Sequence, residues 1–553
     1  MTEPLVTVTD LSVAFHAAAG SADGFVPAVD GLSFELPPGG ALGIVGESGS
    51  GKSTAAYALL GLHRGTGARV TGTVRVAGHD VQAADEAALR RLRGGVAAMV
   101  FQDPLSSLDP YQAIGDQIAE VHRTHRRGAS RRAARARAVE VLDRVGIPDA
   151  ARRARSRPHE FSGGMRQRAL IAMALACEPR LLIADEPTTA LDVTVQAQIL
   201  DLLRELRAET GTGLLLVTHD LGVAAGSVDE LLVMKDGRAV EHGPVREVLD
   251  TPRETYTRDL LAAVPRLNVR RKETAPHGVD ESGRPDGSSG DGAEVLLEAV
   301  GLRREFGRGK RSLTAVEDVS LTVHAGETVG VVGESGSGKT TLGRMLVRLL
   351  DPSGGELRYR GREIGSLKER ELRSFRGELQ MVFQDPVSSL NPRRSIGESI
   401  ADPLRAAGRL DEGQITARVR ELLERVGLDP RAHHRYPHEF SGGQRQRVGI
   451  ARALAPEPRL IVCDEPVSAL DVTTQAQVVR LLGELQRDLG LALVFIAHDL
   501  AVVRQVSDRL VVMKGGRVVE QGPADTVYEQ PSHPYTRGLL AAVPALERSG
   551  AAA

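Results

Sequence analysis

The sequence predicts an α/β fold in two tandem copies, each with a largely parallel sheet and a helical subdomain. Three observations support this prediction. A glycine-rich motif occurs twice, as GESGSGKS at residues 46–53 and as GESGSGKT at residues 333–340. Short apolar runs alternate with helix-favouring segments in each half, as in parallel strands joined by helices. The length of 553 residues accommodates two such copies with two lobes each.

The expected elements follow the same order in both halves. An apolar strand, ALGIV or TVGVV, leads into the glycine-rich loop and a helix. A helical stretch then precedes a segment with two adjacent glycines. One later strand ends in LLIADEP or LIVCDEP, and the next ends in LLLVTHD or LVFIAHD. Because ligands of a parallel sheet lie beyond the carboxyl ends of its strands, the acidic and histidine residues are placed at the expected binding edge.

The two halves are copies of one ancestral unit. The offset between Ser162 and Ser441 is 279 residues, and the DEP, ALD and histidine motifs that follow keep that offset. Residues 270–293 are polar, rich in Gly, Ser and Pro, and short of large apolar groups, so they cannot bury enough surface to fold. We expect a first domain at residues 1–265, a flexible linker at 266–293 and a second domain at 294–553.

Each glycine-rich loop has the context that a phosphate-binding loop (P-loop) requires, with a strand before it and a helix after it. Glycine lets the backbone turn so that successive N–H groups point into one concavity, and the helix adds its positive dipole end. Such a nest binds a polyphosphate. The predicted phosphate-binding residues are Gly46, Glu47, Ser48, Gly49, Ser50, Gly51, Lys52, Ser53 and Thr54, and, in the second copy, Gly333, Glu334, Ser335, Gly336, Ser337, Gly338, Lys339, Thr340 and Thr341.

Composition excludes several classes of function. The net charge of −2 argues against a protein that holds nucleic acid through a global positive field. Cys177 and Cys463 fall at different places in the two halves, so neither a disulfide framework nor a multi-cysteine metal cluster is encoded. The N-terminal stretch does not look like a signal peptide, and no apolar run reaches about 18 residues, so we expect a cytosolic chain that meets a membrane only from outside.

Acidic residues follow an apolar run in each copy. Asp185 can hold Mg²⁺ together with the hydroxyl oxygen of Ser53. The adjacent Glu186 is placed to accept a proton from an attacking water. Two acids could also simply cap a buried strand, but their recurrence in register favours the magnesium site. The corresponding residues of the second copy are Asp464, Thr340 and Glu465.

A second anion site is predicted in each half, at FSGGMRQRALIAMALA (residues 161–176) and FSGGQRQRVGIARALA (residues 440–455). In both segments a serine suited to an N-cap and two glycines precede a helix, so free N–H groups face an anion there. The residues of these two sites are Ser162, Gly163 and Gly164, and Ser441, Gly442 and Gly443.

Together these motifs resemble the ATP-binding-cassette (ABC) ATPases. The P-loop, the glutamine of VFQDP, the SGG signature, the DEP acids, the aspartate of ALD and the histidine of THD or AHD occur in order in both halves. The resemblance covers nearly all of the chain outside the linker. It implies the P-loop NTPase fold of the ABC ATPases, and it implies ATP and Mg²⁺ as ligands.

The resemblance also implies a head-to-tail pair of halves, in which the P-loop of one half faces the signature of the other. Site one would pair Lys52 with Ser441, and site two would pair Lys339 with Ser162. Further roles implied by the resemblance are general bases at Glu186 and Glu465, contact with the γ-phosphate and the attacking water at His219 and His498, sensing of Mg²⁺ at Gln102 and Gln384, and adenine stacking at Phe15 and Phe306.

Two points in this assignment leave alternatives. Phe25 competes with Phe15 for the adenine, and a plain core role for either is an equal alternative. The signature normally ends in glutamine, as at Gln444, whereas the first copy has Met165. We expect both sites to hydrolyse ATP, with site two the slower.

The segments after the last strand, at residues 240–265 and 519–544, resemble the tails of dipeptide, oligopeptide and nickel importer ATPases. The second tail keeps HPYT, whereas the first reads ETYT. This branch implies membrane permease subunits, a solute-binding protein that acts through them, and a peripheral position on the cytoplasmic membrane face. Peptide, nickel, glutathione and opine remain open as solutes. No cysteine cluster for iron and sulfur is present, so no such cofactor is expected.

From Arg123 to Arg157 the chain has twelve arginines against three acids. A solvated helical face explains this run. The alternative hypothesis is contact with anionic lipid headgroups or acidic permease loops. Two rival functions were weighed for the whole chain. A ribosome-associated two-cassette protein would be expected to carry a long charged helical linker, and a DNA-repair cassette ATPase would need zinc cysteines or a coiled-coil insertion.

Overall fold

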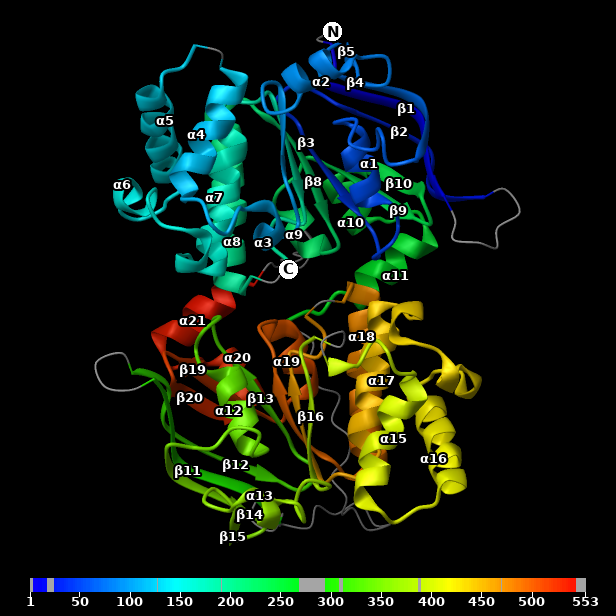
Figure 1. The fold of residues 1–553 in the computed structure, drawn as a ribbon, viewed down its shortest axis with the longest axis vertical. Coiled ribbons are helices and arrows are strands. Elements are labelled where there is room, and N and C mark those ends of the chain that lie inside the picture. The colour runs from blue at the N-terminus through cyan, green and yellow to red at the C-terminus, as the bar shows by residue number, and fades with distance from the viewer. Residues whose placement is uncertain are drawn as a thin grey trace, which may run out of the picture.

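The computed structural model describes residues 3–16, 24–126, 128–189, 191–267, 294–307, 312–385, 389–468 and 470–543. The expected linker at 266–293 lies outside these ranges from residue 268 onward, so the domain boundaries stay predictions. The two halves are stacked along the longest axis of the molecule (Figure 1). The helical lobe of the first half lies at the upper left and that of the second at the lower right, so the halves are arranged head to tail.

The first half is built on a six-stranded sheet of order β10-β9-β3-β8-β7-β6. Neighbouring strands are parallel except β9 and β10, which form an antiparallel pair at one edge. Every residue of the strands β3 and β7 is buried, which explains why parallel strands covered on both faces read as continuous apolar runs. The strands are β3 (Ala41–Val45), β6 (Ala97–Val100), β7 (Leu181–Asp185), β8 (Gly213–Thr218), β9 (Glu230–Lys235) and β10 (Arg238–Pro244).

A separate antiparallel sheet of order β2-β1-β4-β5 packs beside the first one. The sequence analysis did not predict it. Its strands carry register shifts, including one between Val8 and Leu11 where Asp10 has a φ of 53°, so their apolar residues do not alternate regularly. The strands are β1 (Val6–His16), β2 (Phe25–Leu36), β4 (Arg69–Val76) and β5 (His79–Asp80).

Helices of the first half cover the parallel sheet and form the helical lobe. The antiparallel helices α4 and α5 pack against α7, which begins at the signature. The helices are α1 (Lys52–Ala58), α2 (Glu86–Leu92), α3 (Pro104–Ser107), α4 (Ile114–His125), α5 (Arg131–Arg144), α6 (Ala150–Arg153), α7 (Gly163–Leu175), α8 (Val193–Thr210), α9 (Leu221–Ala225), α10 (Val245–Asp250) and α11 (Thr255–Ala263).

The second half repeats this architecture, with a parallel-type sheet of order β16-β17-β18-β13-β19-β20 and an antiparallel sheet of order β12-β11-β14-β15. Its strands are β11 (Val295–Phe306), β12 (Leu313–His324), β13 (Thr328–Val332), β14 (Gly354–Tyr359), β15 (Arg362–Glu363), β16 (Leu379–Val382), β17 (Leu460–Asp464), β18 (Ala492–Ile496), β19 (Arg509–Lys514) and β20 (Arg517–Pro523). Its helices are α12 (Lys339–Leu346), α13 (Glu369–Leu372), α15 (Ile396–Ala407), α16 (Glu412–Arg425), α17 (Gly442–Leu454), α18 (Val472–Leu489), α19 (Leu500–Val506), α20 (Ala524–Glu529) and α21 (Pro534–Ala541).

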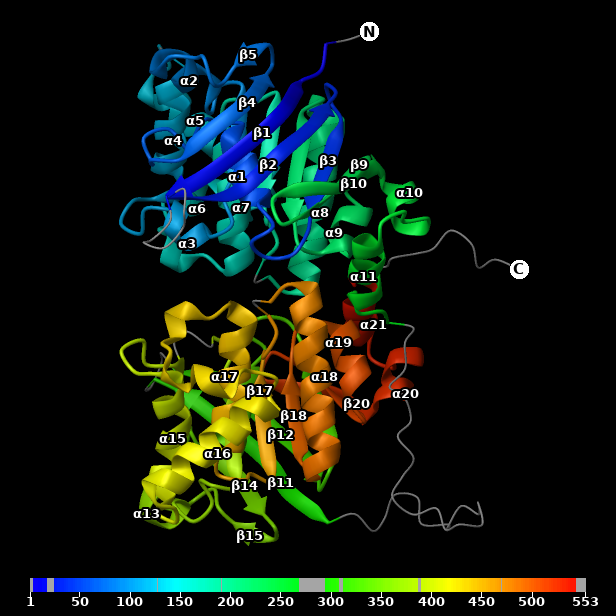
Figure 2. The ribbon, with the colours of Figure 1, turned by 90° about the vertical axis from the view of Figure 1, so that its right-hand side faces the viewer.

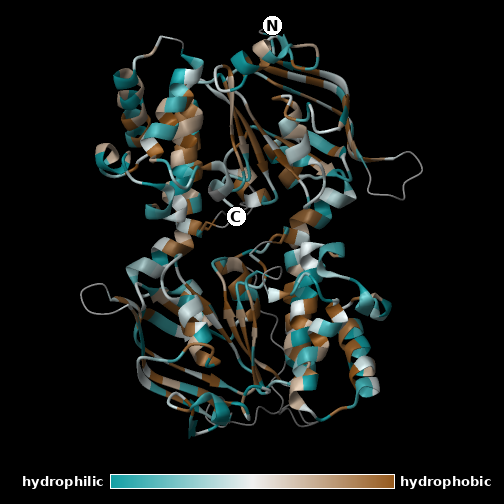
Figure 3. Ribbon diagram, viewed as in Figure 1, coloured by the Kyte–Doolittle hydropathy of each residue, from teal (hydrophilic) through white to brown (hydrophobic). Residues whose placement is uncertain are grey.

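Each half has two apolar clusters, one between its two sheets and one between the parallel sheet and the helices. Apolar residues accordingly fill the central strands and the inner helix faces (Figure 3). Within the described ranges, no helix is both long and apolar enough to cross a lipid bilayer.

The tail helices lie where the two halves meet. The helix α11 of the first half contacts α18 of the second, and α21 of the second contacts α8 of the first. Both views of the ribbon show α11 and α21 at this junction (Figures 1 and 2). The C-terminal segments therefore belong to the interface.

Candidate nucleotide sites between the halves

The P-loop lysine is held inside its own loop in both halves. Lys52 Nζ donates to the carbonyl oxygens of Gly46 at 2.8 Å and Glu47 at 2.7 Å. Lys339 Nζ donates in the same way to Gly333 at 2.7 Å and to the following residue at 2.8 Å. Burial lowers the pKa of both ammonium groups, although nearby carboxylates oppose the shift. Each loop thus presents a desolvated cation, which suits a polyphosphate.

Glycine is required at the first position of each loop. Gly46 has a φ of 155°, and an added Cβ would lie 2.2 Å from the carbonyl oxygen of Met234. Gly333 has a φ of 150° and the same 2.2 Å approach to Met513. Because no side chain fits, this backbone conformation is available only to glycine.

The predicted magnesium ligands lie together in each half. Ser53 Oγ donates to Asp185 Oδ1 at 2.9 Å, and Thr340 Oγ1 donates to Asp464 Oδ1 at 2.9 Å. Asp185 Oδ2 is buried and has no hydrogen-bond partner in the part of the chain that the structure describes. Burial raises the pKa of both carboxyls. A hydroxyl beside a buried, underused carboxylate oxygen fits a hard cation that takes its other ligands from phosphate and water.

The glutamate after each aspartate is held by its predicted partners. Gln102 Nε2 donates to Glu186 Oε2 at 2.7 Å, and His219 Nδ1 lies 3.2 Å from Glu186 Oε1. Glu186 has a φ of 47°, a left-handed conformation that is rare for a side chain of this kind. The distances in the second half are 2.8 Å from Gln384 Nε2 and 3.5 Å from His498 Nδ1, both to Glu465 Oε2.

Electrostatics keep this glutamate ionised. Burial opposes ionisation of Glu186, but the hydrogen bond and charge of His219 outweigh it, so the pKa of Glu186 lies below its usual value. Burial likewise opposes protonation of His219, and Glu186 outweighs it, so the pKa of His219 is raised. Glu465 and His498 show the same directions. A carboxylate that stays deprotonated beside a histidine can accept a proton from water.

The P-loop of each half meets the ALD aspartate of the other. The N–H of Ser48 donates to Asp471 Oδ2, and the N–H of Ser335 donates to Asp192 Oδ2, both at 3.4 Å. The second oxygen of each aspartate caps a helix, α18 or α8. Both aspartates belong to the ALD motif, but the motif by itself assigns them no role at the site. A contact between residues 423 positions apart leaves no local signal, although the duplicated motif marks both aspartates.

A cavity of about 420 Å³ surrounds the second P-loop, and both halves line it. The first half contributes Leu191 and Asp192. The signature residues 162–164 are not part of the lining. Residues of the second half that line the cavity include Phe306, Ser335, Gly336, Gly338, Lys339, Thr340, Thr341, Gln384, Glu465 and His498.

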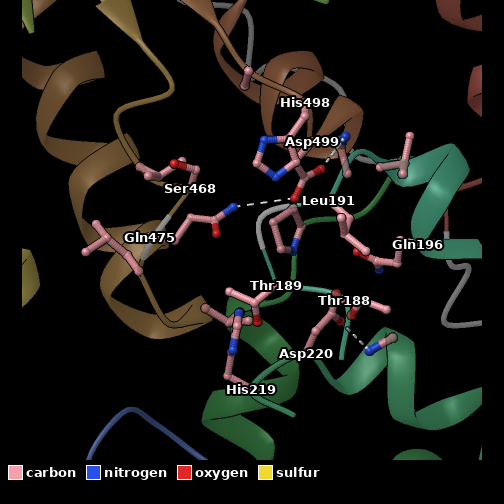
Figure 4. A pocket seen from close by; sticks show the side chains of 18 of the residues that line it. Thr188, Thr189, Leu191, Gln196, His219, Asp220, Ser468, Gln475, His498 and Asp499 are labelled. Carbon is pink, nitrogen blue, oxygen red and sulfur yellow. Dashed lines mark hydrogen bonds between the residues drawn. The ribbon is translucent and has the colours of Figure 1, made fainter. Parts of the chain in front are cut away.

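A second, smaller cavity lies between the halves, with a volume of about 120 Å³. His219 and His498 enter it from opposite halves, together with the aspartates that follow them (Figure 4). Burial raises the pKa of Asp220, and the charge of Asp499 across the interface adds to the shift. The two predicted phosphate-contacting histidines therefore share one interfacial space.

Comparison with known proteins agrees with this geometry. The ABC transporter family model matches residues 29–189 and 316–468. The chain belongs to the ABC transporter family. The model of the oligopeptide/dipeptide transporter C-terminal region matches residues 240–287 and 519–551. This ABC protein is therefore the ATPase subunit of a peptide-type importer, in which hydrolysis of ATP is coupled to import.

Similar proteins include the glutathione import ATP-binding proteins GsiA. The protein of Escherichia coli O157:H7 is 47% identical over 99% of this chain and 90% of its own length. The protein of Salmonella paratyphi A is 46% identical over the same shares. A solved dimer of the ATP-binding cassette MJ0796 with ADP and phosphate is 29% identical over 41% of this chain and 99% of its own, with a TM-score of 0.39.

The helices that begin at the two ABC signatures differ in their N-terminal capping. In the second half, Gln444 Oε1 accepts from the N–H of Ser441 at 3.0 Å, while Ser441 Oγ accepts from the N–H of Gln444 at 3.3 Å. In the first half, Ser162 Oγ accepts from the N–H of Met165 at 3.3 Å, but a methionine side chain cannot return the bond. Methionine in place of glutamine at position 165 thus removes one of the two hydrogen bonds of a capping box.

The predicted adenine-stacking aromatics have different surroundings. Phe306 is 39% exposed and lines the cavity of the second P-loop, with Arg304 4.9 Å above its ring centroid. Phe15 packs edge-on against His63 at 5.6 Å. Phe25 lies against His16 at 4.3 Å between ring centroids. Phe306 is thus accessible from the cavity of the second P-loop, and adenine stacking by Phe306 and Phe15 stays a prediction.

Proposed function

We propose that this chain powers the import of glutathione or a similar short peptide by hydrolysing MgATP at two composite sites between its halves. Two reciprocal hydrogen bonds support the composite nature of both sites, one from Ser48 to Asp471 and one from Ser335 to Asp192. A P-loop that already touches the opposite half can complete its site only there. The glutathione part is supported by the 46–47% identity to the GsiA proteins.

At site one, residues of the first half have defined roles. At site two, the corresponding residues of the second half have the same roles. Lys52 and the loop N–H groups bind the β- and γ-phosphates. Ser53 and Asp185 hold Mg²⁺, which neutralises phosphate charge when bound. Glu186 accepts a proton from the attacking water, and His219 orients that glutamate and the γ-phosphate.

The signatures complete the sites when the halves close. Ser441 and its glycines would meet the phosphates at Lys52, and Ser162 with its glycines would meet those at Lys339. Moving a two-state equilibrium from 1:99 to 99:1 takes about 5.5 kcal/mol of differential binding. Charge-assisted hydrogen bonds contribute about 1.5 to 3 kcal/mol each, so a few from each signature suffice to drive closure. Hydrolysis removes the γ-phosphate and with it these bonds.

The partners follow from the importer class. We propose that the chain sits peripherally on the cytoplasmic membrane face, bound to permease subunits, and that a solute-binding protein acts on it only through them. No nucleic acid is involved.

Reconstitution with the permease and solute-binding subunits tests the solute. ATPase activity is measured with the binding protein loaded in turn with glutathione, a dipeptide, nickel or an opine. We expect glutathione to stimulate turnover most. Stimulation by another solute alone would overturn the glutathione assignment and leave the composite sites standing.

A further inference from the structure

A tyrosine in each tail reaches the P-loop of its own half. The N–H of Glu47 donates to the hydroxyl oxygen of Tyr256 at 3.3 Å, and the N–H of Glu334 donates to that of Tyr535 at 3.0 Å. The two tyrosines are separated by the same 279 residues as the catalytic motifs. A contact that recurs in register in both copies is part of the duplicated unit.

The peptide bonded by the tyrosine also binds the P-loop lysine. The N–H of Glu47 belongs to the same peptide unit as the carbonyl of Gly46, which accepts from Lys52 Nζ at 2.8 Å. One rigid plane is thus held by the ammonium on one side and by the phenol on the other. In the second half the corresponding carbonyl, that of Gly333, lies 2.7 Å from its lysine.

The tail is built to hold this tyrosine in place. Glu241 on β10 accepts hydrogen bonds from the N–H groups of Arg253 at 2.8 Å and Glu254 at 3.3 Å, just before α11. Lys235 at the end of β9 lies 4.8 Å above the ring centroid of Tyr256. Thr257, the next residue, has no exposed surface. The ring is therefore fixed from the strand side and from the start of its own helix.

The second tail repeats these contacts. Glu520 accepts from the N–H groups of Ser532 at 2.7 Å and His533 at 3.1 Å, and Lys514 lies 4.6 Å from the ring centroid of Tyr535. The first tail has ETYT where the second has HPYT, so it retains the tyrosine and the buried threonine and loses the histidine and proline. The side chains that make the contacts, namely the glutamate, the lysine and the tyrosine, are present in both tails, and the bonds to the glutamate come from backbone N–H groups that do not depend on the side chain.

The same tail helix also contacts the opposite half. The helix α11 packs against α18, whose capping residue Asp471 accepts the hydrogen bond from Ser48 of the first P-loop. The first P-loop is therefore contacted both by the tail of its own half and by the cap of α18, the helix of the opposite half against which that tail packs. The views in Figures 1 and 2 show α11 and α21 in this position.

We propose that Tyr256 and Tyr535 are positioning residues for ATP binding, which orient the first peptide of each P-loop and link it to the interface between the halves. This inference rests on the composite sites of the proposed function. The hydroxyl acts through the P-loop peptide and the lysine and does not touch the nucleotide. Burial raises the pKa of each phenol to about 12, so the hydroxyl stays neutral at physiological pH.

Replacement by phenylalanine in the full chain tests the role, because Tyr256→Phe and Tyr535→Phe keep the ring and its lysine contact and remove only the hydroxyl. We expect the Kd for ATP of the altered site to rise about two- to ten-fold. Hydrogen exchange of the P-loop peptide should become faster, while the midpoint of thermal unfolding stays near that of the parent. Tyr359→Phe is the matched control, since that buried hydroxyl bonds Glu378 at 2.6 Å in the sheet region. It should lower thermal stability and leave the Kd unchanged.

An unchanged Kd together with unchanged exchange at the P-loop would overturn the inference. A fall in thermal stability without a change in Kd would do the same, because it would assign the tyrosines a purely structural role. Failure of the parent chain to hydrolyse ATP would instead count against the proposed function, so the two outcomes are distinguishable.

Discussion

The glutamate and histidine at the ends of neighbouring strands are the predicted catalytic residues of each half. Glu186 lies between an amide donor from Gln102 and the ring of His219, in a left-handed backbone conformation. A residue in such a conformation persists only where its surroundings hold it. The structure therefore places the proton acceptor by several contacts at once and leaves little freedom for its side chain.

Removing the carboxylate tests its role at each site. Glu186→Gln and Glu465→Gln keep the side-chain shape but cannot accept a proton. We expect each to lower hydrolysis at its own site by about 100-fold or more, because general base catalysis contributes that much. Steady-state ATPase assays should show the larger loss for Glu186→Gln, since we expect site two to be the slower. If Glu465→Gln leaves the total rate unchanged while Glu186→Gln abolishes it, site two is degenerate.

The pairing of His219 with Glu186 makes stability depend on pH. Although burial opposes it, Glu186 raises the pKa of His219, so this stabilisation is complete below the ordinary histidine pKa of 6.5 and is lost as the pH rises through the raised value. The pKa of Glu186 is lowered, so its share is present above 4.5 and is lost as the pH falls through the lowered value.

The free energy of unfolding should therefore differ most between the parent and His219→Gln from pH 4.5 to 6.5. Urea denaturation at several pH values measures the difference. A difference of equal size at about pH 5.5 and about pH 9 would show that the ion pair contributes nothing.

At the scale of elements, the helix that begins at each signature depends on its cap. The helix α17 starts with a reciprocal capping box between Ser441 and Gln444, and α7 has only the bond from Met165 to Ser162. An uncapped N–H at the start of a helix is a free donor, and this one belongs to the signature that we expect to meet the phosphates of the opposite half when the halves close.

Completing the capping box in the first half should stabilise α7. We expect Met165→Gln to raise the free energy of unfolding by about 0.5 to 1 kcal/mol and to raise turnover at site two, because a better-ordered signature costs less to align. Denaturation and ATPase assays in the Glu186→Gln background measure both effects. The reverse change, Gln444→Met, is the matched control; assayed in the Glu465→Gln background, in which site one is the active site, it should weaken α17 and lower turnover at site one. Rates equal to that of the corresponding background for both Met165→Gln and Gln444→Met would show that the cap does not limit turnover.

The arginine-rich segment of the first helical lobe is less uniform than its sequence. Arg126 donates to the carbonyl of Cys177, and Arg137 pairs with Glu140 and Glu178, so these arginines serve the fold. Arg127, which the sequence analysis counted, lies outside the described residues. The exposed arginines at the start of α5 remain available to an anionic surface.

Reversing those charges tests the membrane hypothesis. We expect Arg131→Glu with Arg132→Glu to weaken binding to vesicles containing anionic lipid by about thirty-fold or more at low salt, since each basic residue near such a surface contributes about 1 kcal/mol. Arg420→Glu, on the exposed face of α16, is the control. Unchanged vesicle binding would leave the segment a solvated helical face.

For the whole molecule, the decisive contacts cross between the halves. The aspartates of the ALD motifs cap α8 and α18 with one oxygen and meet the opposite P-loop with the other. The tail helices lie on the same two helices. Each half thus contacts the other half directly beside the P-loop at which a nucleotide is expected to bind.

A substitution at Asp192 that keeps the cap of α8 but removes the contact with Ser335 tests whether this contact couples the two halves. Asp192→Ser keeps an N-cap for α8 but has no second oxygen for Ser335. We expect thermal stability near that of the parent and a loss of about two- to five-fold in ATPase rate, with weaker cooperativity in ATP. Asp201→Ser, an exposed change on the same helix, is the control. A rate equal to that of the parent would show that this contact does not couple the halves.

The local parts of each site could be predicted because each lies within a few consecutive residues. The P-loop, the DEP acids and the signature each combine a strand or helix end with the side chains that act there. The contact of Tyr256 with Glu47 spans 209 residues, and that of Ser48 with Asp471 spans 423, so no local pattern contains them. The antiparallel sheet was missed because its bulges break the alternation of apolar residues.

The sequence by itself determined that two copies of an α/β unit with a P-loop motif are present, and it predicted which residues bind phosphate and which glutamate sits beside the predicted metal ligands. Only the tertiary structure decided that each P-loop contacts the ALD aspartate of the opposite half, that the tail tyrosines contact the P-loop peptide, and that both histidines share one interfacial cavity. The reason is physical. Backbone conformation and side-chain chemistry are set by near neighbours in the chain, whereas contacts between distant segments depend on how completed elements pack.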